Sequence, residues 1–70
     1  MRRKPVVSTS LASVGYEATT RILEVEFRKG RIYQYHGVGA KLFEQLMQAE
    51  SKGRFMNAHI RNAYHFTRIR

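Results

Sequence analysis

The chain has 70 residues, 43% of them hydrophobic, a length that supports one small core and excludes a two-domain enzyme with an interdomain cleft. Cysteine is absent, which excludes disulfides and thiolate metal sites, and no apolar run approaches the ~20 residues of a membrane-spanning helix. The formal net charge of +8 is typical of proteins that bind polyanions, and these properties together favour a cytoplasmic binding module over an enzyme.

The chain begins with a basic arm, residues 1–8, which we expect to be disordered, and residues 9–70 form the predicted domain. Polar residues at 8–10 end the arm's short apolar run, so we expect no signal peptide. Residues 11–16 alternate weakly between the two faces of a strand and predict the first strand. Residues 22–28 predict the second, because apolar and charged side chains alternate clearly there.

The loop after this strand decides which face the tyrosines of the third predicted strand, residues 31–36, occupy. A two-residue turn at Lys29 and Gly30 would place Tyr33 and Tyr35 on the glutamate face. A three-residue loop ending at Gly30 would place both tyrosines on the apolar face. We favour this loop, because it requires a positive φ only at the glycine. The three strands then form an antiparallel meander.

Helical periodicity follows the strands and predicts a helix over residues 39–49 that covers the apolar sheet face. Ser51 is typical of an N-cap and predicts a short second helix over residues 52–61. Its expected inward side chains are Phe55, His59 and Ile60. A basic aromatic tail over residues 62–68 is extended and can add a strand at the sheet edge. The predicted fold class is therefore α+β, with a three-stranded antiparallel meander, one amphipathic helix on one face, a short second helix and a basic aromatic carboxyl-terminal tail.

The positive charge is concentrated at the two ends of the chain. Residues 1–4 carry three cations, residues 5–50 are neutral overall, and residues 51–70 carry five cations and no carboxylate. A neutral body with basic ends is expected of a polyanion binder, and a merely solubilising surface is the alternative interpretation.

The last twenty residues hold the predicted binding surface. If Ser51 caps a helix, the N–H groups of the next three residues form a cradle for phosphate, and Gly53 lets the anion approach. An ordinary capped turn is the alternative. Tyr64 and Phe66 would either stack on bases or pack on the sheet as a terminal strand. The predicted nucleic-acid-binding residues are Ser51, Lys52, Gly53, Arg54, Arg61, Tyr64, Phe66, Arg68 and Arg70.

Other candidate sites have less support. Tyr33 and Tyr35 could form a stacking platform for bases, but the favoured loop places them in the core. Glu24 and Glu26 lie about 7 Å apart along one strand face, which we expect to be solvated because no cleft opposes it. The three histidines lack metal-ligand spacing. We therefore predict no catalytic residue, no metal and no cofactor.

The same residues resemble a short family, the KTSC domain, named after a carboxyl-terminal extension of some lysyl-tRNA synthetases. The resemblance covers residues 9–68. It rests on residues 11–16 (LASVGY), 23–27 (LEVEF), 33–35 (YQY), Val38, 51–55 (SKGRF), Asn57 and 60–61 (IR). Gly39 stands where the family often has proline. The resemblance implies a small stand-alone or appended module for which RNA binding has been suggested.

These observations together predict a non-enzymatic module that binds nucleic acid, RNA rather than DNA, through phosphate contacts from residues 52–70, to which the basic amino-terminal arm could add. The alternative is a protein-interaction module or a homodimer that pairs an exposed strand. We expect a cytoplasmic location and no membrane partner.

Overall fold

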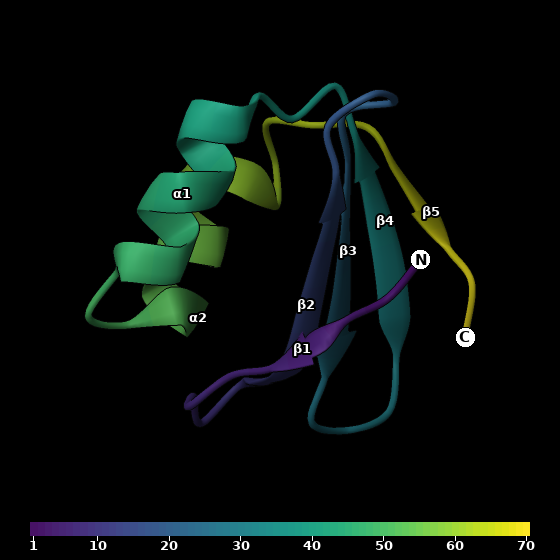
Figure 1. The fold of residues 1–70 in the computed structure, drawn as a ribbon. Coiled ribbons are helices and arrows are strands. Elements are labelled where there is room, and N and C mark those ends of the chain that lie inside the picture. The colour runs from purple at the N-terminus through teal and green to yellow at the C-terminus, as the bar shows by residue number, and fades with distance from the viewer.

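In the computed structural model, which describes residues 1–70, one antiparallel sheet carries helices on one face (Figure 1). The strands are β1 (Lys4–Pro5), β2 (Leu11–Glu17), β3 (Ile22–Phe27), β4 (Ile32–His36) and β5 (Phe66–Arg68). The helices are α1 (Ala40–Gln48), α2 (Lys52–Phe55) and η1 (Met56–Ile60), a π-helical segment that continues α2. No helix has the length and apolar character needed to cross a bilayer. The α+β class is confirmed.

The predicted count of three strands was wrong, because the sheet has five in the order β1-β2-β3-β4-β5. Both additional strands are short edge strands. In β1, Lys4 and Pro5 pair with β2, and the chain just before them lies so close to Gly15 that a Cβ there would be 2.7 Å from the Arg2 carbonyl oxygen. At the other edge β5 pairs with β4. The domain boundary at residue 8 stays a prediction, although part of the basic arm is paired with the sheet.

The hairpin between β3 and β4 has the favoured three-residue loop. Val25 pairs with Tyr33, and the Phe27 N–H donates to the Arg31 carbonyl at 2.8 Å. Gly30 has φ +97°, the left-handed conformation that glycine adopts without a steric penalty. Tyr35 is therefore on the apolar face, where it is 1% exposed, and its membership of the core is confirmed.

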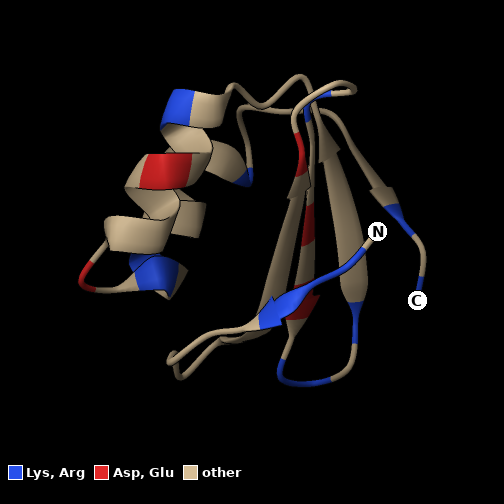
Figure 2. Ribbon diagram, viewed as in Figure 1, with Lys and Arg blue, Asp and Glu red and all other residues tan.

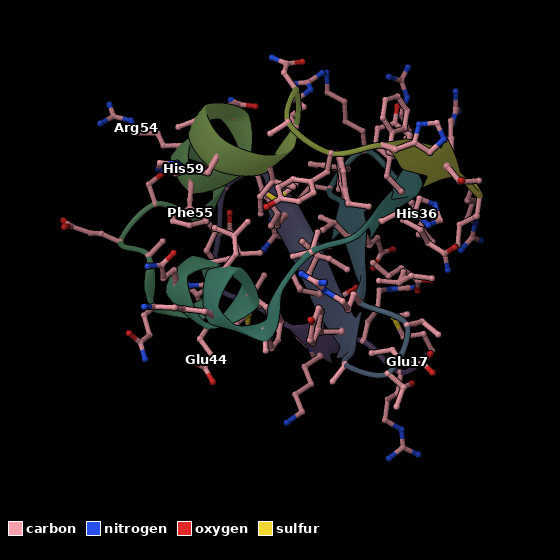
Figure 3. All side chains as sticks on the ribbon, turned by 90° about the horizontal axis from the view of Figure 1, so that it is seen from above. Glu17, His36, Glu44, Arg54, Phe55 and His59 are labelled. Carbon is pink, nitrogen blue, oxygen red and sulfur yellow. The ribbon has the colours of Figure 1, made fainter.

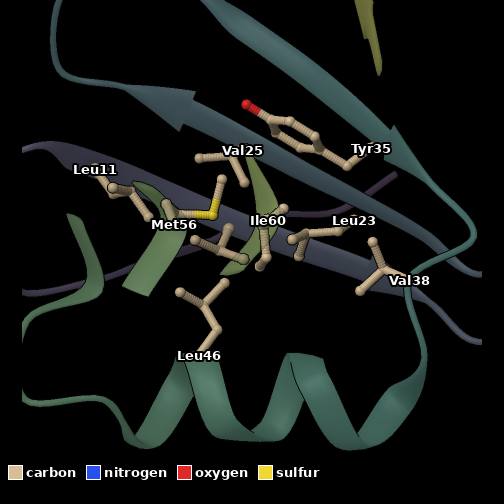
Figure 4. Packing of buried hydrophobic residues seen from close by; sticks show 9 residues of the cluster. Leu11, Leu23, Val25, Tyr35, Val38, Leu46, Met56 and Ile60 are labelled. Carbon is tan, nitrogen blue, oxygen red and sulfur yellow. The ribbon is translucent and has the colours of Figure 1, made fainter. Parts of the chain in front are cut away.

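The core lies between this sheet face and the helices (Figure 4). Its buried residues are Leu11, Val14, Leu23, Val25, Tyr35, Val38, Leu46, Met56 and Ile60. Leu11 and Val14 are three positions apart in β2, yet both are in the core, because a register shift between Leu11 and Ser13 puts them on the same side of the sheet. The predicted inward position of His59 was wrong: its side chain is exposed, and Met56 takes the buried position on the helix.

The opposite sheet face is closed by a polar network, so the expectation that Glu24 is solvated was wrong. Glu24 is 4% exposed; its carboxylate is paired with Arg3 and accepts a hydrogen bond from Gln34 at 2.8 Å. Arg3 also donates to Ser13 at 2.9 Å, and Ser13 donates to Glu26 at 2.7 Å. Burial raises the pKa of Glu24, but the hydrogen bonds from Gln34 and Arg3 and the nearby positive charges outweigh it, so its pKa lies below the ordinary value.

Candidate nucleic-acid interface

The cations of residues 51–70 do not form one continuous surface. Lys52 donates to the Ala49 carbonyl at 3.4 Å, and Arg54 lines a hollow with Phe55 and His59. Figure 3 shows Arg54 on the outer side of the helices, at the opposite end of the view from His36 of β4, the strand beside β5. The predicted residues are therefore divided among several places on the molecule.

Ser51 caps α2 as predicted, since its Oγ accepts a hydrogen bond from the Arg54 N–H at 3.3 Å. That bond occupies one of the three N–H groups of the predicted phosphate cradle. Gly53 faces Ser10 of the loop before β2, and a Cβ at Gly53 would lie 2.8 Å from the serine Oγ. The glycine therefore permits close packing of helix against loop, which favours the capped-turn interpretation over the cradle.

The carboxyl-terminal tail packs on the sheet. Tyr64 is half-buried against the core. Phe66 faces Tyr33 and Tyr35 at centroid distances of 5.2 Å and 6.0 Å, yet 48% of its surface is exposed. Arg68 pairs with Tyr33 in the strand register, and the Arg70 carbonyl accepts a hydrogen bond from the Arg68 guanidinium at 3.2 Å.

The structure brings one predicted residue, Arg61, to a place that the sequence interpretation missed. This place is a pocket of about 310 Å³ at the end of the β3–β4 hairpin, which we call the hairpin pocket. Its eight lining residues are Thr9, Ser10, Phe27, Arg28, Lys29, Arg31, Tyr33 and Arg61. They supply four cations, two aromatic rings and the aliphatic hydroxyl groups of Thr9 and Ser10. No carboxylate lines the pocket.

Three separate parts of the chain build this pocket. The hairpin loop is joined to the loop before β2, because the Arg28 N–H donates to the Ser10 carbonyl at 2.9 Å and its Nε to the Ser8 carbonyl at 2.7 Å. The three-residue loop sets Arg31 opposite Phe27 and therefore on the apolar face. Arg61 follows η1 and donates to Asn57 at 3.3 Å.

The pocket is electropositive because its cations are not neutralised. The single ion pair of the molecule joins Arg3 to Glu24 on the other sheet face, and no other Lys or Arg pairs with a glutamate. Figure 2 shows the hairpin loop in blue and the glutamates elsewhere along the strands and helices. Burial raises the pKa of the Tyr35 hydroxyl, and the positive charge of Arg61 opposes that shift.

Tyr33 connects the cations to an aromatic cluster. Its ring centroid lies 5.6 Å from that of Phe27, 6.3 Å from that of Tyr35 and 5.2 Å from that of Phe66. Tyr33 and Phe27 are half-buried and both line the pocket. Such contacts fix the ring in place, so the pocket offers a positioned aromatic surface beside four positive charges.

The family model of the KTSC domain matches residues 7–64. The chain belongs to the KTSC domain family. An uncharacterized protein of Stutzerimonas stutzeri is 42% identical over 57 residues, which cover 81% of this chain and 80% of the relative. A lysine–tRNA ligase of Trichormus variabilis is 33% identical over 54 residues, 77% of this chain but 10% of the ligase.

A solved structure agrees with the fold of this KTSC domain. The crystal structure of a KTSC domain protein from Yersinia pestis superposes with a TM-score of 0.93 at 38% identity, and the match covers 99% of this chain and 97% of the other. All residues of the hairpin pocket lie inside the family match, whereas Phe66, Arg68 and Arg70 lie beyond it. The pocket therefore belongs to the segment that the KTSC model describes.

Proposed function

We propose that this KTSC domain binds nucleic acid, RNA in preference to DNA, through the hairpin pocket. The observation that carries the proposal is the convergence of four cations from two distant parts of the chain, without a carboxylate, on two half-buried aromatic rings. Guanidinium groups suit phosphate because their N–H groups match its oxygens in pairs. This proposal moves the interface from the predicted carboxyl-terminal surface to the hairpin and keeps Arg61.

The preference for RNA is supported by the proteins in which a similar segment occurs. The similar segment makes up 10% of lysine–tRNA ligases from Trichormus variabilis and two Nostoc species, enzymes whose name associates them with an RNA. Phosphate contacts carry no sequence information by themselves, so we expect weak sequence specificity.

Salt dependence tests the proposal directly. If the four pocket cations each neutralise one phosphate, log affinity falls with log salt with a slope of about −3 on single strands. The measurement is fluorescence anisotropy of a labelled single-stranded RNA at several salt concentrations, with the DNA of the same sequence for comparison. Absence of binding at low salt, or a slope near zero, contradicts the proposal.

A matched pair of variants locates the interface. Arg61→Ala removes a pocket cation, whereas Arg54→Ala removes an exposed cation outside the pocket. We expect Arg61→Ala to weaken RNA binding and to reduce the salt slope by about 1, and Arg54→Ala to change neither. If Arg54→Ala has the larger effect, the interface lies on the outer side of α2 instead.

A protein-interaction role is the second candidate, and one observation favours it. The outer edge of β5 has no neighbouring strand; Phe66 of β5 and Ile69, which follows it, are 48% and 49% exposed. A free strand edge can pair with another chain. A molar mass that rises with concentration in size-exclusion chromatography with light scattering, together with no binding to any RNA, would favour this role.

A further inference from the structure

We infer that the hairpin pocket holds one unpaired nucleotide, with its base against Tyr33 and its phosphate among the pocket cations, so that the domain selects single strands over duplexes. This inference rests on the proposed function and names the part of the nucleic acid that enters the site. The pocket volume of about 310 Å³ lies at the small end of the ~300–1,000 Å³ of small-molecule sites. It is therefore a place for one ligand unit.

The aromatic wall of the pocket supports a base as the ligand. Phe27 meets Tyr33 edge-on, at an interplanar angle of 67°, and Phe66 lies against Tyr33 at 37°. Tyr33 is thus held in place by contacts with two rings, and a base that stacks on it does not have to order it first. Stacking on aromatic side chains is how proteins bind bases that are free of a partner strand.

The cationic wall supports a phosphate next to that base. The Arg28 guanidinium is anchored to the Ser8 carbonyl, whereas the Lys29 and Arg31 side chains make no hydrogen bond within the protein. Thr9 and Ser10 add hydroxyl groups at the same rim. An anion bound there would gain charge-assisted hydrogen bonds without breaking an existing ion pair.

A duplex cannot bind to the aromatic wall and the cationic wall of the pocket at the same time. Its phosphates can reach the cations, but its bases are stacked on one another and paired, so none is free to lie on Tyr33. The pocket thus offers a duplex only the electrostatic part of the binding energy, and it offers a single strand both parts.

The test compares three probes on the whole chain: a single-stranded RNA, the blunt duplex of the same sequence, and adenosine 5′-monophosphate. We expect the single strand to bind at least about tenfold more tightly than the duplex at equal salt, because one stacked base has an effect of that order. Adenosine monophosphate should shift the backbone amide signals of Arg28, Arg31 and Tyr33 in a ¹⁵N NMR titration.

Variants separate stacking from charge. Tyr33→Leu should weaken single-strand binding about tenfold and leave both the duplex affinity and the salt slope unchanged, and Tyr33→Phe should bind more tightly than Tyr33→Leu because the ring is restored. Tyr16→Leu is the matched control. It removes a half-buried ring that stacks on Phe43 at 4.7 Å, outside the pocket, and should not change affinity.

The outcomes distinguish the binding of one unpaired nucleotide from the proposed binding of nucleic acid on which it rests. Equal affinity for single strand and duplex, with no effect of Tyr33→Leu and a steep salt slope, overturns the inference and leaves the proposed function standing. No binding of any RNA overturns both. Binding of adenosine monophosphate without binding of any strand also overturns the inference as stated, since the pocket would then serve a free nucleotide.

Discussion

The positive charges on the two faces of the sheet differ in whether they have a carboxylate partner within the protein. On one face Arg3 is paired with Glu24, which is 4% exposed, and serine and glutamine side chains complete the network. On the other face, at the hairpin pocket, the cations have no carboxylate partner. Charges that are satisfied inside the molecule stabilise its fold, whereas charges left unsatisfied at a rim of aromatic rings are available to a ligand. Substitutions on the two faces should therefore separate stability from binding.

The largest expected effect on stability comes from breaking the buried pair. Arg3→Met leaves the Glu24 carboxylate buried with only Gln34 as a partner and should lower the free energy of unfolding by about 1.5–3 kcal/mol, the order of a hydrogen bond to a charged group. Urea unfolding followed by circular dichroism measures this. Arg2→Met, on the exposed neighbour, should cost less than about 0.5 kcal/mol. Equal effects of the two substitutions would show that the pair contributes no stability of its own.

A smaller effect is expected at the hairpin loop that supports the pocket. Gly30→Ala forces a side chain into φ +97° and should cost about 1–2 kcal/mol, although nothing lies within 4 Å of the new Cβ. Lys29→Ala, at the exposed position before it, should change thermal stability little and weaken RNA binding. The opposite result, a stable Gly30→Ala and an unstable Lys29→Ala, would argue against the three-residue loop.

The parts of the fold that were predicted from the sequence depend on local patterns. The alternation around Leu23 and Val25 is typical of a half-buried strand, and Gly30 determines the loop and therefore the face of both tyrosines. The tail over residues 62–68 was expected to be able to add an edge strand, and β5 pairs there with β4. The edge strand β1 escaped prediction, because it is two residues long, is held by a partner distant in sequence, and has no local pattern that indicates the pairing.

The candidate site was predicted in part, and the error has a physical reason. Residues 5–50 carry no net charge, because their glutamates balance their cations. The sequence interpretation therefore placed no binding surface at Arg28, Lys29 and Arg31. A strand separates its two faces, however, and Glu24 and Glu26 point away from the pocket into the Arg3 network. Three cations within four residues at a predicted hairpin loop were the available signal. That Arg61 joins them depends on how the helices pack, which no local pattern reveals.

The smallest expected effect is a dependence on pH that only one of the two faces should show. Glu24 has a pKa below its ordinary value of 4.5 in the folded protein, so near pH 4 the folded state binds fewer protons than the unfolded chain. The stability that Glu24 contributes is therefore present above about pH 4.5 and is lost as the pH falls through the lowered pKa. Urea midpoints measured between about pH 3 and 6 should fall more steeply with acid for the native chain than for Glu24→Gln. The pocket is lined by neither a histidine nor a carboxylate, so it should bind RNA with the same affinity between about pH 5.5 and 8. If RNA affinity instead followed the acid loss of stability, the two faces would be coupled through the sheet, and the separation of folding charges from binding charges would be wrong.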